Sequence, residues 1–428
     1  MLKLFDKYKT ALAALLARGA SMGLQFATSL VLVRALGASG MGIYSLYNSW
    51  MQLLSSVAGM GTTTHSLRTV SVLAGRHDYL QIKKFLFKLS YFLVGAGAVL
   101  ILLIWPFSGF LSGLFLDNSQ LAWMLTLSAF AALIFMLFKI YAESLKALRL
   151  VNTALLCESG LLSMMLIVIG GIYIALGWSL EIERFLMLHI GVLLVTTLVM
   201  LVLIFKTINS AKEQRSTDAV SVMHVSLLPL WGSGLLGMWF MNMPILLLPH
   251  FTTTDEIGVF SMAYRLITIA VNILMVLASI YGPRFARDFA VGNVEGLRQG
   301  LRQTRLISML IYFPLFILFV LIPGQVMQIF GKEFASGGQW LLVMALGQMV
   351  YASTGLVGYM MNMIHQDRQE FWIMLSASIF MLISIVVLGH WFGTTGVAGG
   401  FAMGLAMKNL TSMYFAHYHL RKMSSLSI

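Results

Sequence analysis

Residues 34–68 read RALGASGMGIYSLYNSWMQLLSSVAGMGTTTHSLR, and a second version of this stretch returns at 250–284. The run GIYS at 42–45 aligns with GVFS at 258–261, and Arg68 aligns with Arg284. We call this shift, which places residue 42 on residue 258, the repeat offset. Only three of these positions are identical, but the hydropathy profile of the whole chain repeats at the same offset. We therefore expect a chain made of two similar lobes.

The composition indicates a polytopic membrane protein. Hydrophobic residues make up 59% of the chain and charged residues only 10%, with a mean hydropathy of +0.87, whereas charged residues form about a quarter of an ordinary soluble domain. The basic N-terminus leads into an apolar stretch that Arg18 interrupts, and no small-residue cleavage site follows it. We expect a retained first span rather than a signal peptide.

Twelve stretches are long and apolar enough to cross a bilayer, because a helix needs about 20 residues to span ~30 Å of hydrocarbon. They cover residues 12–34, 43–64, 86–108, 120–142, 152–176, 183–205, 222–248, 258–281, 303–325, 338–362, 370–391 and 395–417. The pattern predicts an all-α integral membrane fold of twelve transmembrane helices in two six-helix lobes. An even number of spans per lobe predicts a pseudo-twofold axis along the membrane normal, with a central cavity.

The lobes are expected at residues 1–208 and 222–428, joined by a polar cytoplasmic linker at 209–221. Orientation follows from the basic residues, since cytoplasmic loops carry an excess of lysine and arginine. Nearly all of them fall on one predicted side, whereas the other side holds only Arg34, Arg184 and Lys332. Both termini are therefore expected in the cytoplasm. The net charge of +12 is then a topology signal that also contacts anionic membrane lipids, and nucleic acid is not an expected partner.

Polar side chains form stripes along the predicted spans. They are Arg18, Ser21, Gln25 and Ser29 in the first span, Ser45, Asn48, Gln52 and Ser55 in the second, and Ser261, Arg265, Thr268 and Asn272 in the eighth. Because polar residues are costly inside a bilayer, stripes in both lobes indicate a shared hydrated cavity. Helix packing is the competing explanation for the serines and threonines, whereas the deep arginines favour a function.

The predicted cavity is cationic. Its deep cations, which we expect to be unpaired, are Arg18, Arg265 and Lys408, and no aspartate or glutamate falls within spans 1, 2, 7 or 8. Arginine suits phosphate because its planar fork binds two oxygens at once. We therefore expect a phosphate-bearing substrate. The candidate substrate-binding residues are Arg18, Gln25, Asn48, Gln52, Arg265, Asn272 and Lys408.

Two further features concern energy and motion. Glu158, the one deep acid, is a candidate for H+ or Na+ coupling, although burial as a neutral acid or pairing with a neighbouring helix explains it equally well. Lys139 and Glu143 have the spacing of a helical ion pair.

In the seventh span, three candidate gating residues favour a bent, movable helix, with a fixed kink as the alternative. They are Pro229, Gly234 and Pro244.

No motif for catalysis or cofactor binding stands out in the sequence. It contains no nucleotide-binding G-x-x-x-x-G-K-[ST] loop, no H-E-x-x-H motif and no cluster of histidine and cysteine with metal-ligand spacing. The single cysteine, Cys157, excludes an intramolecular disulfide. We expect no catalytic residue, no metal and no cofactor apart from a coupling ion, and hence a transporter rather than an enzyme.

Two stretches carry a family resemblance. Residues 34–37 (RALG) followed by 42–45 (GIYS), and residues 258–265 (GVFSMAYR) followed by 281–286 (YGPRFA), resemble matching segments in the two lobes of polysaccharide transporters. These form a branch of the multidrug/oligosaccharidyl-lipid/polysaccharide exporter superfamily. The resemblance extends over essentially the whole chain in length, span number and loop layout, while its motifs are short and degenerate.

The resemblance implies a Wzx-type flippase of the bacterial inner (cytoplasmic) membrane. Such a protein would move undecaprenyl-diphosphate-linked oligosaccharide from the cytoplasmic to the periplasmic leaflet, for O-antigen or another surface polysaccharide. In alternating access, Arg18 would engage the diphosphate first and Arg265 afterwards, while the prenyl chain stays in lipid. The expected partners are the lipid-linked substrate, membrane lipids and the machinery for polysaccharide polymerisation and chain length.

Three other functions are compatible with parts of the sequence. A lipid II flippase has similar charge requirements, but typically has two further C-terminal spans. A cation-coupled multidrug exporter of the same fold would be expected to carry acids in the first two spans, which have none. A membrane polysaccharide polymerase or ligase, from a different class, usually places its arginines in a sizeable periplasmic loop, and every predicted periplasmic loop is short.

Overall fold

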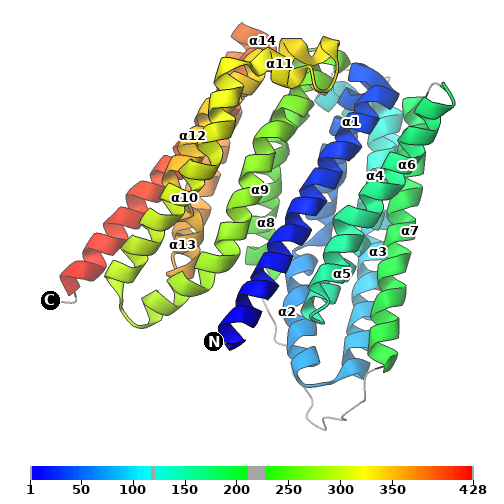
Figure 1. Ribbon diagram of the computed structural model, residues 1–428. Coiled ribbons are helices and arrows are strands. Elements are labelled where there is room, and N and C mark those ends of the chain that lie inside the picture. Colours follow the sequence, from blue (N-terminus) through cyan, green and yellow to red (C-terminus); the bar gives the residue numbers. More distant parts are fainter. Residues whose placement is uncertain (1, 117–120, 179, 211–226, 427–428) are drawn as a thin grey trace. The chain divides into compact units, whose positions relative to one another are not determined.

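The computed structural model describes residues 2–116, 121–178, 180–210 and 227–426, with side chains from residue 19 onward except at 115–116, 227–230, 233, 269–276, 279 and 426. Within these ranges every element is a helix and there is no strand, which confirms the predicted all-α fold (Figure 1). The chain divides into two compact units, residues 1–238 (unit 1) and 239–428 (unit 2). Most of the predicted linker lies outside the described residues, so the predicted lobe boundaries stay a prediction.

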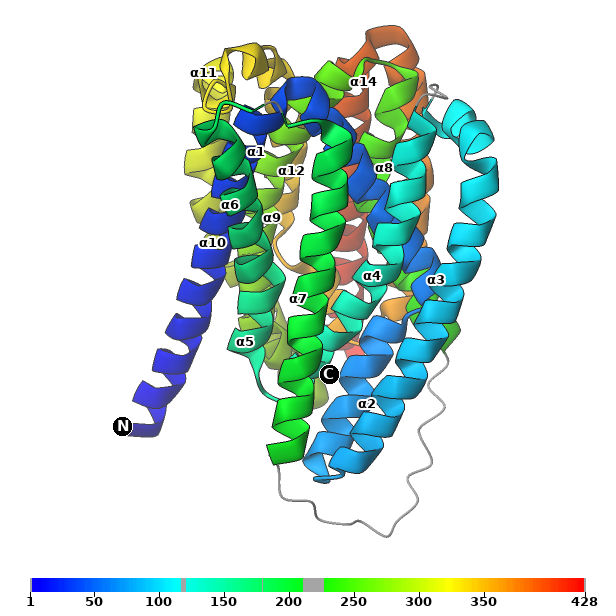
Figure 2. The same ribbon diagram turned by 90° about the vertical axis from the view of Figure 1, so that its right-hand side faces the viewer.

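Unit 1 is organised around helix α4. Its elements are α1 (Leu2–Gly59), α2 (Thr62–Gly75), α3 (Tyr79–Leu116), α4 (Ala122–Ala147), α5 (Val151–Leu155), the π-helix η2 (Leu156–Leu161), α6 (Leu162–Ala175), α7 (Ile182–Ser210) and the first half of α8 (Leu227–Leu247). α4 packs against α1, α2, α3 and α7, and Figure 2 shows α3, α4 and α7 running along one another. Small and apolar residues cover much of its surface, so it is buried on several sides.

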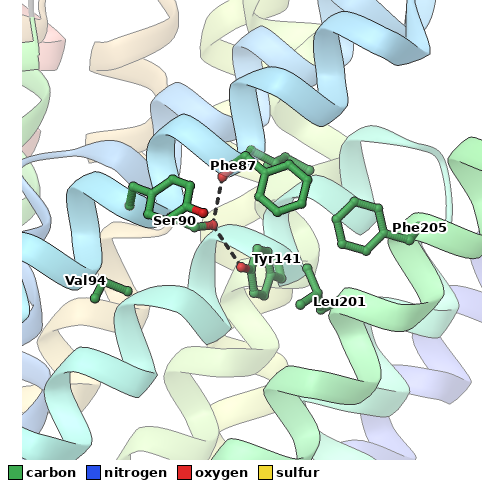
Figure 3. Close-up of a pocket in the computed structure, with 8 residues that line it drawn as sticks. Phe87, Ser90, Val94, Tyr141, Leu201 and Phe205 are labelled. Atoms are coloured by element: carbon green, nitrogen blue, oxygen red, sulfur yellow. Dashed lines mark hydrogen bonds between the residues drawn. The ribbon is translucent and has the colours of Figure 1, made fainter.

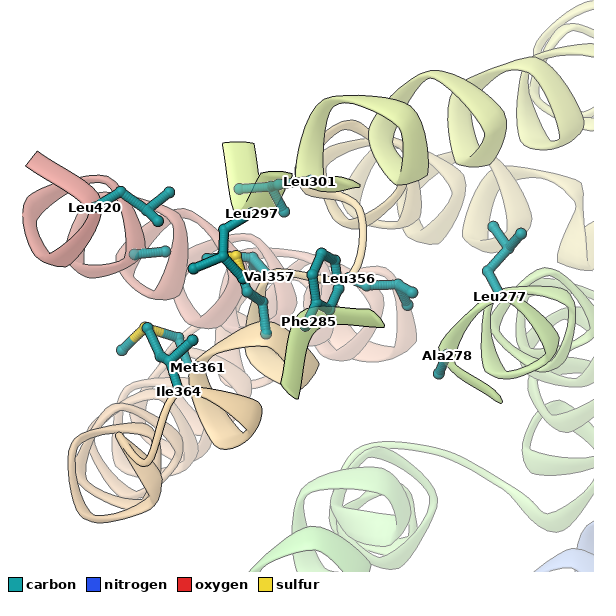
Figure 4. Packing of buried hydrophobic residues seen from close by; sticks show 12 residues of the cluster. Leu277, Ala278, Phe285, Leu297, Leu301, Leu356, Val357, Met361, Ile364 and Leu420 are labelled. Carbon is teal, nitrogen blue, oxygen red and sulfur yellow. The ribbon is translucent and has the colours of Figure 1, made fainter. Parts of the chain in front are cut away.

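Unit 2 is organised in a similar way around α12. After the second half of α8 it contains the 3-10 helix η3 (Leu248–His250), α9 (Thr254–Ala290), α10 (Val294–Leu321), α11 (Pro323–Met327), the 3-10 helix η4 (Lys332–Gly337), α12 (Gly338–Thr354), α13 (Val357–Met363) and α14 (Asp367–Leu426). α12 packs against α9, α10 and α14. A methionine-rich apolar cluster joins α9, α10, α13 and α14 around the fully buried Phe285 (Figure 4).

Two helices are much longer than a bilayer crossing, and each is broken by one glycine. α1 has 58 residues and a non-helical Gly37 (φ 67°, ψ −174°), while α14 has 60 residues and a non-helical Gly393 (φ 57°, ψ −137°). Only glycine adopts this combination of angles readily. Each break falls between two predicted spans, so α1 and α14 each contain a predicted pair.

The described helices form a multi-span membrane fold. Seven helical stretches of the described residues are long and apolar enough to cross a bilayer, and one of them runs through α5, η2 and α6. The bent pair α12 and α13 makes an eighth, with α1 and α14 each counted once. The predicted number of twelve crossings therefore stays a prediction.

Helix boundaries recur at the repeat offset. The matching boundaries are the starts of α4 and α12 (122 and 338), the ends of α4 and α13 (147 and 363), the starts of α5 and α14 (151 and 367) and the ends of α7 and α14 (210 and 426). Gly177 and Gly393, which occupy equivalent positions in the two copies, both have positive φ, at 65° and 57°. The repeat is therefore present in local structure as well as in hydropathy.

Candidate functional site

The structure distributes the predicted site residues over both units. Gln25, Asn48, Gln52, Glu158 and Gly234 lie in unit 1, and Pro244, Arg265 and Lys408 lie in unit 2. The side chains of Arg18, Pro229 and Asn272 lie outside the described set, so the roles predicted for them stay predictions.

The polar stripe of α1 is arranged along both sides of the Gly37 break. Gln25 is exposed on the first leg, and Asn48 and Gln52 are half-buried on the second. The Asn48 amide donates to the backbone carbonyl of Tyr44 at 3.1 Å. Ser29 and Ser55 donate to the carbonyls of Gln25 and Gln52, so these hydroxyls satisfy themselves on their own helix.

Arg265 lies half-buried in the first half of α9. Its neighbour Tyr264 donates its hydroxyl to the carbonyl of Met241 in α8 at 2.6 Å, and the Thr268 hydroxyl donates to the carbonyl of Arg265. The bond from Tyr264 ties α9 to α8 beside the arginine. α8 itself runs as one helix from Leu227 to Leu247 through Pro244, and its predicted gating motion stays a prediction.

Glu158 is held by two lysines of α4. Its carboxylate lies 3.1 Å from the Lys139 ammonium and 2.7 Å from that of Lys146, and Lys146 also lies 2.8 Å from Glu143. The expected pairing of Lys139 with Glu143 is therefore wrong, because Glu143 pairs with Lys146 and Lys139 reaches across to the neighbouring helix. Of the explanations considered for Glu158, pairing with a neighbouring helix is the one observed.

The backbone at Glu158 is unusual, since residues 156–161 form the π-helix η2 between α5 and α6. A π-turn inserts one extra residue per turn and often marks a functional position. Lys139 lies above the Phe135 ring, at 5.5 Å from its centre. The acid is thus fixed by two cations on a locally widened helix.

Lys408 forms an ion pair within α14. Its ammonium lies 2.7 Å from the carboxylate of Glu370, with side chains only 16% and 11% exposed, and Ser412 donates to the other carboxylate oxygen at 2.8 Å. The pair joins the two legs of α14 on either side of Gly393. At Gly358 of α13, a β-carbon would lie within 3 Å of both charged groups. The prediction that Lys408 is an unpaired cation is therefore wrong.

Two acids that pair with lysine, Glu158 and Glu370, occupy related places in the two units. Glu370 aligns with Ala154 at the repeat offset, four residues or about one helical turn from Glu158. The two acids have partners on different elements. Glu158 pairs with lysines of α4, and Glu370 pairs with Lys408 on the second leg of α14. The sequence allowed Glu158 to pair with a neighbouring helix without naming the lysines, and it did not predict the pairing of Glu370 with Lys408.

One further polar contact was not anticipated. His189 of α7 is buried, with its Nδ1 atom 3.1 Å from the Tyr47 hydroxyl of α1, and its ring also packs against Tyr44. The two residues are 142 positions apart, so no spacing signal in the sequence could have paired them. Among the described residues, no group of three or more histidine, cysteine, aspartate or glutamate side chains could hold a metal ion.

Known proteins of the same fold are transporters. No family model matches the chain. A multidrug resistance MATE family transporter of the MOP superfamily, in an inward-facing conformation, superimposes with a TM-score of 0.77 at 14% identity, over 95% of this chain and 96% of that one. The chain therefore has the fold of this transporter.

A second solved structure of the same fold is the lipid II flippase MurJ in an inward closed conformation. It matches with a TM-score of 0.70 at 14% identity, over 94% of this chain and 86% of that one. In sequence, the chain is 21% identical over 408 residues to the probable low-salt glycan biosynthesis flippase Agl15 of Haloferax volcanii, covering 92% of this chain and 80% of that protein. All three are flippases or transporters, and none is named as an enzyme.

Proposed function

We propose that the chain is a flippase that moves undecaprenyl-diphosphate-linked oligosaccharide units from the cytoplasmic to the periplasmic leaflet of the bacterial inner membrane. The surface polysaccharide served would be O-antigen or a similar polymer. The observation that carries this proposal is the sequence similarity to a glycan biosynthesis flippase over 92% of the chain. The MurJ likeness supports it, because MurJ is also named as a flippase for a lipid-linked substrate.

The proposed architecture has twelve crossings, six in each lobe, with both termini in the cytoplasm. α1 and α14 would each cross twice, turning at Gly37 and Gly393. A helix rises about 1.5 Å per residue, so a single crossing needs only about a third of either helix. The recurrence of helix boundaries at the repeat offset supports the same number of crossings in each lobe.

The proposed binding site for the diphosphate uses arginine. Lys408 pairs with Glu370. The proposed site uses Arg18 and Arg265, because the guanidinium fork binds two phosphate oxygens at once. Spans 1, 2, 7 and 8 contain no acid that would repel a diphosphate. Arg18 would bind it in the state open to the cytoplasm and Arg265 in the state open to the periplasm. Gln25, Asn48, Gln52 and Asn272 would supply hydrogen bonds to sugar hydroxyls.

The energy source has two candidates, an H+ or Na+ gradient acting at Glu158 and removal of product by a polysaccharide polymerase. An ion at Glu158 would have to replace Lys139 or Lys146 as the partner of the carboxylate. Transport of lipid-linked substrate into the outer leaflet of proteoliposomes separates the two. Under gradient coupling, an imposed ion gradient accelerates transport by the wild type and not by Glu158→Gln. If removal of product drives transport, the imposed gradient changes the rate of transport of neither the wild type nor Glu158→Gln.

Complementation tests the proposed function. Deleting the gene should abolish surface polysaccharide and accumulate lipid-linked repeat units on the cytoplasmic side, and the wild-type gene should restore both. Arg18→Ala and Arg265→Ala should fail to restore them at normal protein levels. Arg184→Ala is the matched control, because Arg184 is an exposed arginine whose charge is paired with Glu181. Full complementation by both test variants would exclude the arginine mechanism.

A multidrug exporter is the second candidate, favoured by the TM-score of 0.77 to a multidrug resistance transporter. The same deletion strain discriminates between the two functions. If surface polysaccharide is intact and the cells become sensitive to cationic dyes, the exporter function replaces the flippase. A build-up of lipid II instead of polysaccharide repeat units would identify a lipid II flippase.

A further inference from the structure

Unit 1 carries a half-open apolar cavity of about 220 Å³ between α3, α4 and α7, and none of the residues discussed above lines it. Figure 3 shows its wall, in which Phe87 and Val94 of α3 face Leu201 and Phe205 of α7, with Tyr141 of α4 at the base. Drug-sized ligands typically occupy about 300–1,000 Å³. The cavity is therefore suited to a segment of a flexible chain rather than to a compact molecule.

Three hydroxyl-bearing residues line the cavity. Those of Ser90 and Tyr141 are already hydrogen-bonded, and the third belongs to Tyr91, which is 75% exposed. Ser90 lies 2.7 Å from the backbone carbonyl of Leu86, to which it donates, and 2.8 Å from the Tyr141 hydroxyl (Figure 3). With Ser90 donating to Leu86, the Tyr141 proton is directed to Ser90. An alkyl chain against Ser90 and Tyr141 therefore leaves no hydrogen bond of these two hydroxyls unmade, and the exposed Tyr91 can bond to water or to a headgroup.

One end of the cavity is basic. Lys83, one turn before Phe87 on α3, holds its ammonium 5.6 Å from the centre of the Phe205 ring. The next residue of α7, Lys206, is exposed, and Lys84 is exposed beside Lys83. Since α3 begins at Tyr79 and α7 ends at Ser210, these lysines lie near helix ends, at the depth where lipid headgroups meet a membrane protein.

The other end continues into an apolar surface. Val94 of α3 and Leu198 and Val202 of α7 are 44%, 50% and 64% exposed. In a multi-span membrane protein, large apolar side chains exposed on spanning helices face hydrocarbon. The half-open cavity thus has lysines on one flank and exposed apolar side chains on the other, and we call the cavity with these two flanks the groove.

We propose that this groove binds one anionic glycerophospholipid of the surrounding membrane. Its phosphate lies between Lys83 and Lys206, and one acyl chain fills the cavity between Phe87, Leu201 and Tyr141. The charge of the lysine flank selects anionic over zwitterionic headgroups, and the apolar wall formed by Phe87, Val94, Leu201 and Phe205 selects an alkyl chain. The site does not depend on the proposed transport function.

Binding of defined lipids to the purified full-length protein tests the site. The protein in detergent is titrated with dioleoyl phosphatidylglycerol or dioleoyl phosphatidylcholine, and native mass spectrometry counts the bound lipids. The wild type should bind phosphatidylglycerol more tightly. Each lysine near a headgroup contributes roughly fivefold in affinity, so Lys83→Gln with Lys206→Gln should weaken phosphatidylglycerol binding ~25-fold and abolish the preference.

Two more variants separate this site from general contact with lipid. Val94→Trp places an indole at the mouth of the cavity and should weaken binding of both lipids. Lys88→Gln is the matched control, because five residues beyond Lys83 is about 140° around the helix and its side chain is exposed; it should bind like the wild type. Equal binding of the two lipids by the wild type, or unchanged phosphatidylglycerol binding by both test variants, overturns the proposal.

Discussion

Each unit contains a largely buried carboxylate that forms an ion pair with lysine, Glu158 in unit 1 and Glu370 in unit 2. Glu158 is held by two lysines of a neighbouring helix, and Glu370 by one lysine and one hydroxyl of the facing leg of α14. A charge in a poorly hydrated place is stable only while its partner is present. Each of these ion pairs is therefore stable only while the helices that carry its two partners stay packed together.

Lys408 gives a test at this scale. Lys408→Met leaves the Glu370 carboxylate buried without a counter-charge, and we expect a loss of about 3 kcal/mol in the free energy of unfolding. Combining it with Glu370→Gln should recover most of that loss, because the amide is neutral and its oxygen still accepts from Ser412. Denaturant unfolding in detergent measures both. A double variant as unstable as Lys408→Met would show that the carboxylate is not the source of the instability.

The ion pairs also show which part of the site was predictable from residues alone. Span ranges and the deep location of Glu158 follow from hydropathy, which is a local property of the chain. Pairing is not local. Lys139 had Glu143 at helical spacing but pairs with Glu158, 19 residues away, and Lys408 pairs with Glu370 across the fold of a doubled-back helix. Only tertiary packing selects among such partners.

At the scale of the element, the glycine breaks decide where long helices turn. The predicted spans end at 34 and begin again at 43, and end at 391 and begin again at 395, so hydropathy located both breaks to within a few residues. It could not locate the π-helix at 156–161 or the division of one predicted span into α12 and α13. These changes leave the apolar pattern intact and depend on backbone angles, to which hydropathy is insensitive.

A glycine-to-alanine substitution should lower the stability of the protein at a helix break and raise it inside a regular helix. At Gly393, where φ is +57° and ψ is −137°, Gly393→Ala should destabilise the protein by at least about 1 kcal/mol because an L-residue is strained there. At Gly191, inside α7 with nothing within 4 Å of an added β-carbon, Gly191→Ala should stabilise it by up to about 1 kcal/mol. Melting temperatures in detergent compare them. Equal shifts of the same sign would contradict a strained break at Gly393.

At the scale of the whole molecule, the helix boundaries repeat between the two halves of the chain, whereas the polar side chains at equivalent positions differ. The centres of the units, α4 and α12, start at equivalent positions of the repeat, and so do many of the flanking boundaries. The sequence predicted this offset from three identities and a hydropathy profile. It could not predict how the polar groups in each copy are satisfied, since equivalent positions carry different residues.

Reactivity of introduced cysteines tests the membrane path of the chain. In a Cys157→Ser background, cysteines at Ala38, Arg184, Lys332 and His390 should react with a membrane-impermeant maleimide from outside intact cells. Cysteines at Arg76 and Arg298 should react only after permeabilisation, because basic loops stay in the cytoplasm. If Ala38 and His390 are unreactive from outside, α1 and α14 each cross only once and twelve crossings are wrong.

One aligned pair of positions carries a consequence for the history of the fold. Gly355, which has a φ of 67° and separates α12 from α13, corresponds to Lys139, the partner of Glu158 in the unbroken α4. A β-carbon at Gly355 would lie 2.8 Å from the backbone nitrogen of Arg305. If both halves descend from one duplicated ancestor, this position has specialised in opposite directions, toward a bend in one copy and toward a charge in the other. Lysine at position 355 would be strained and crowded, and glycine at position 139 would remove a partner of Glu158. The residues at these two equivalent positions can therefore no longer be exchanged.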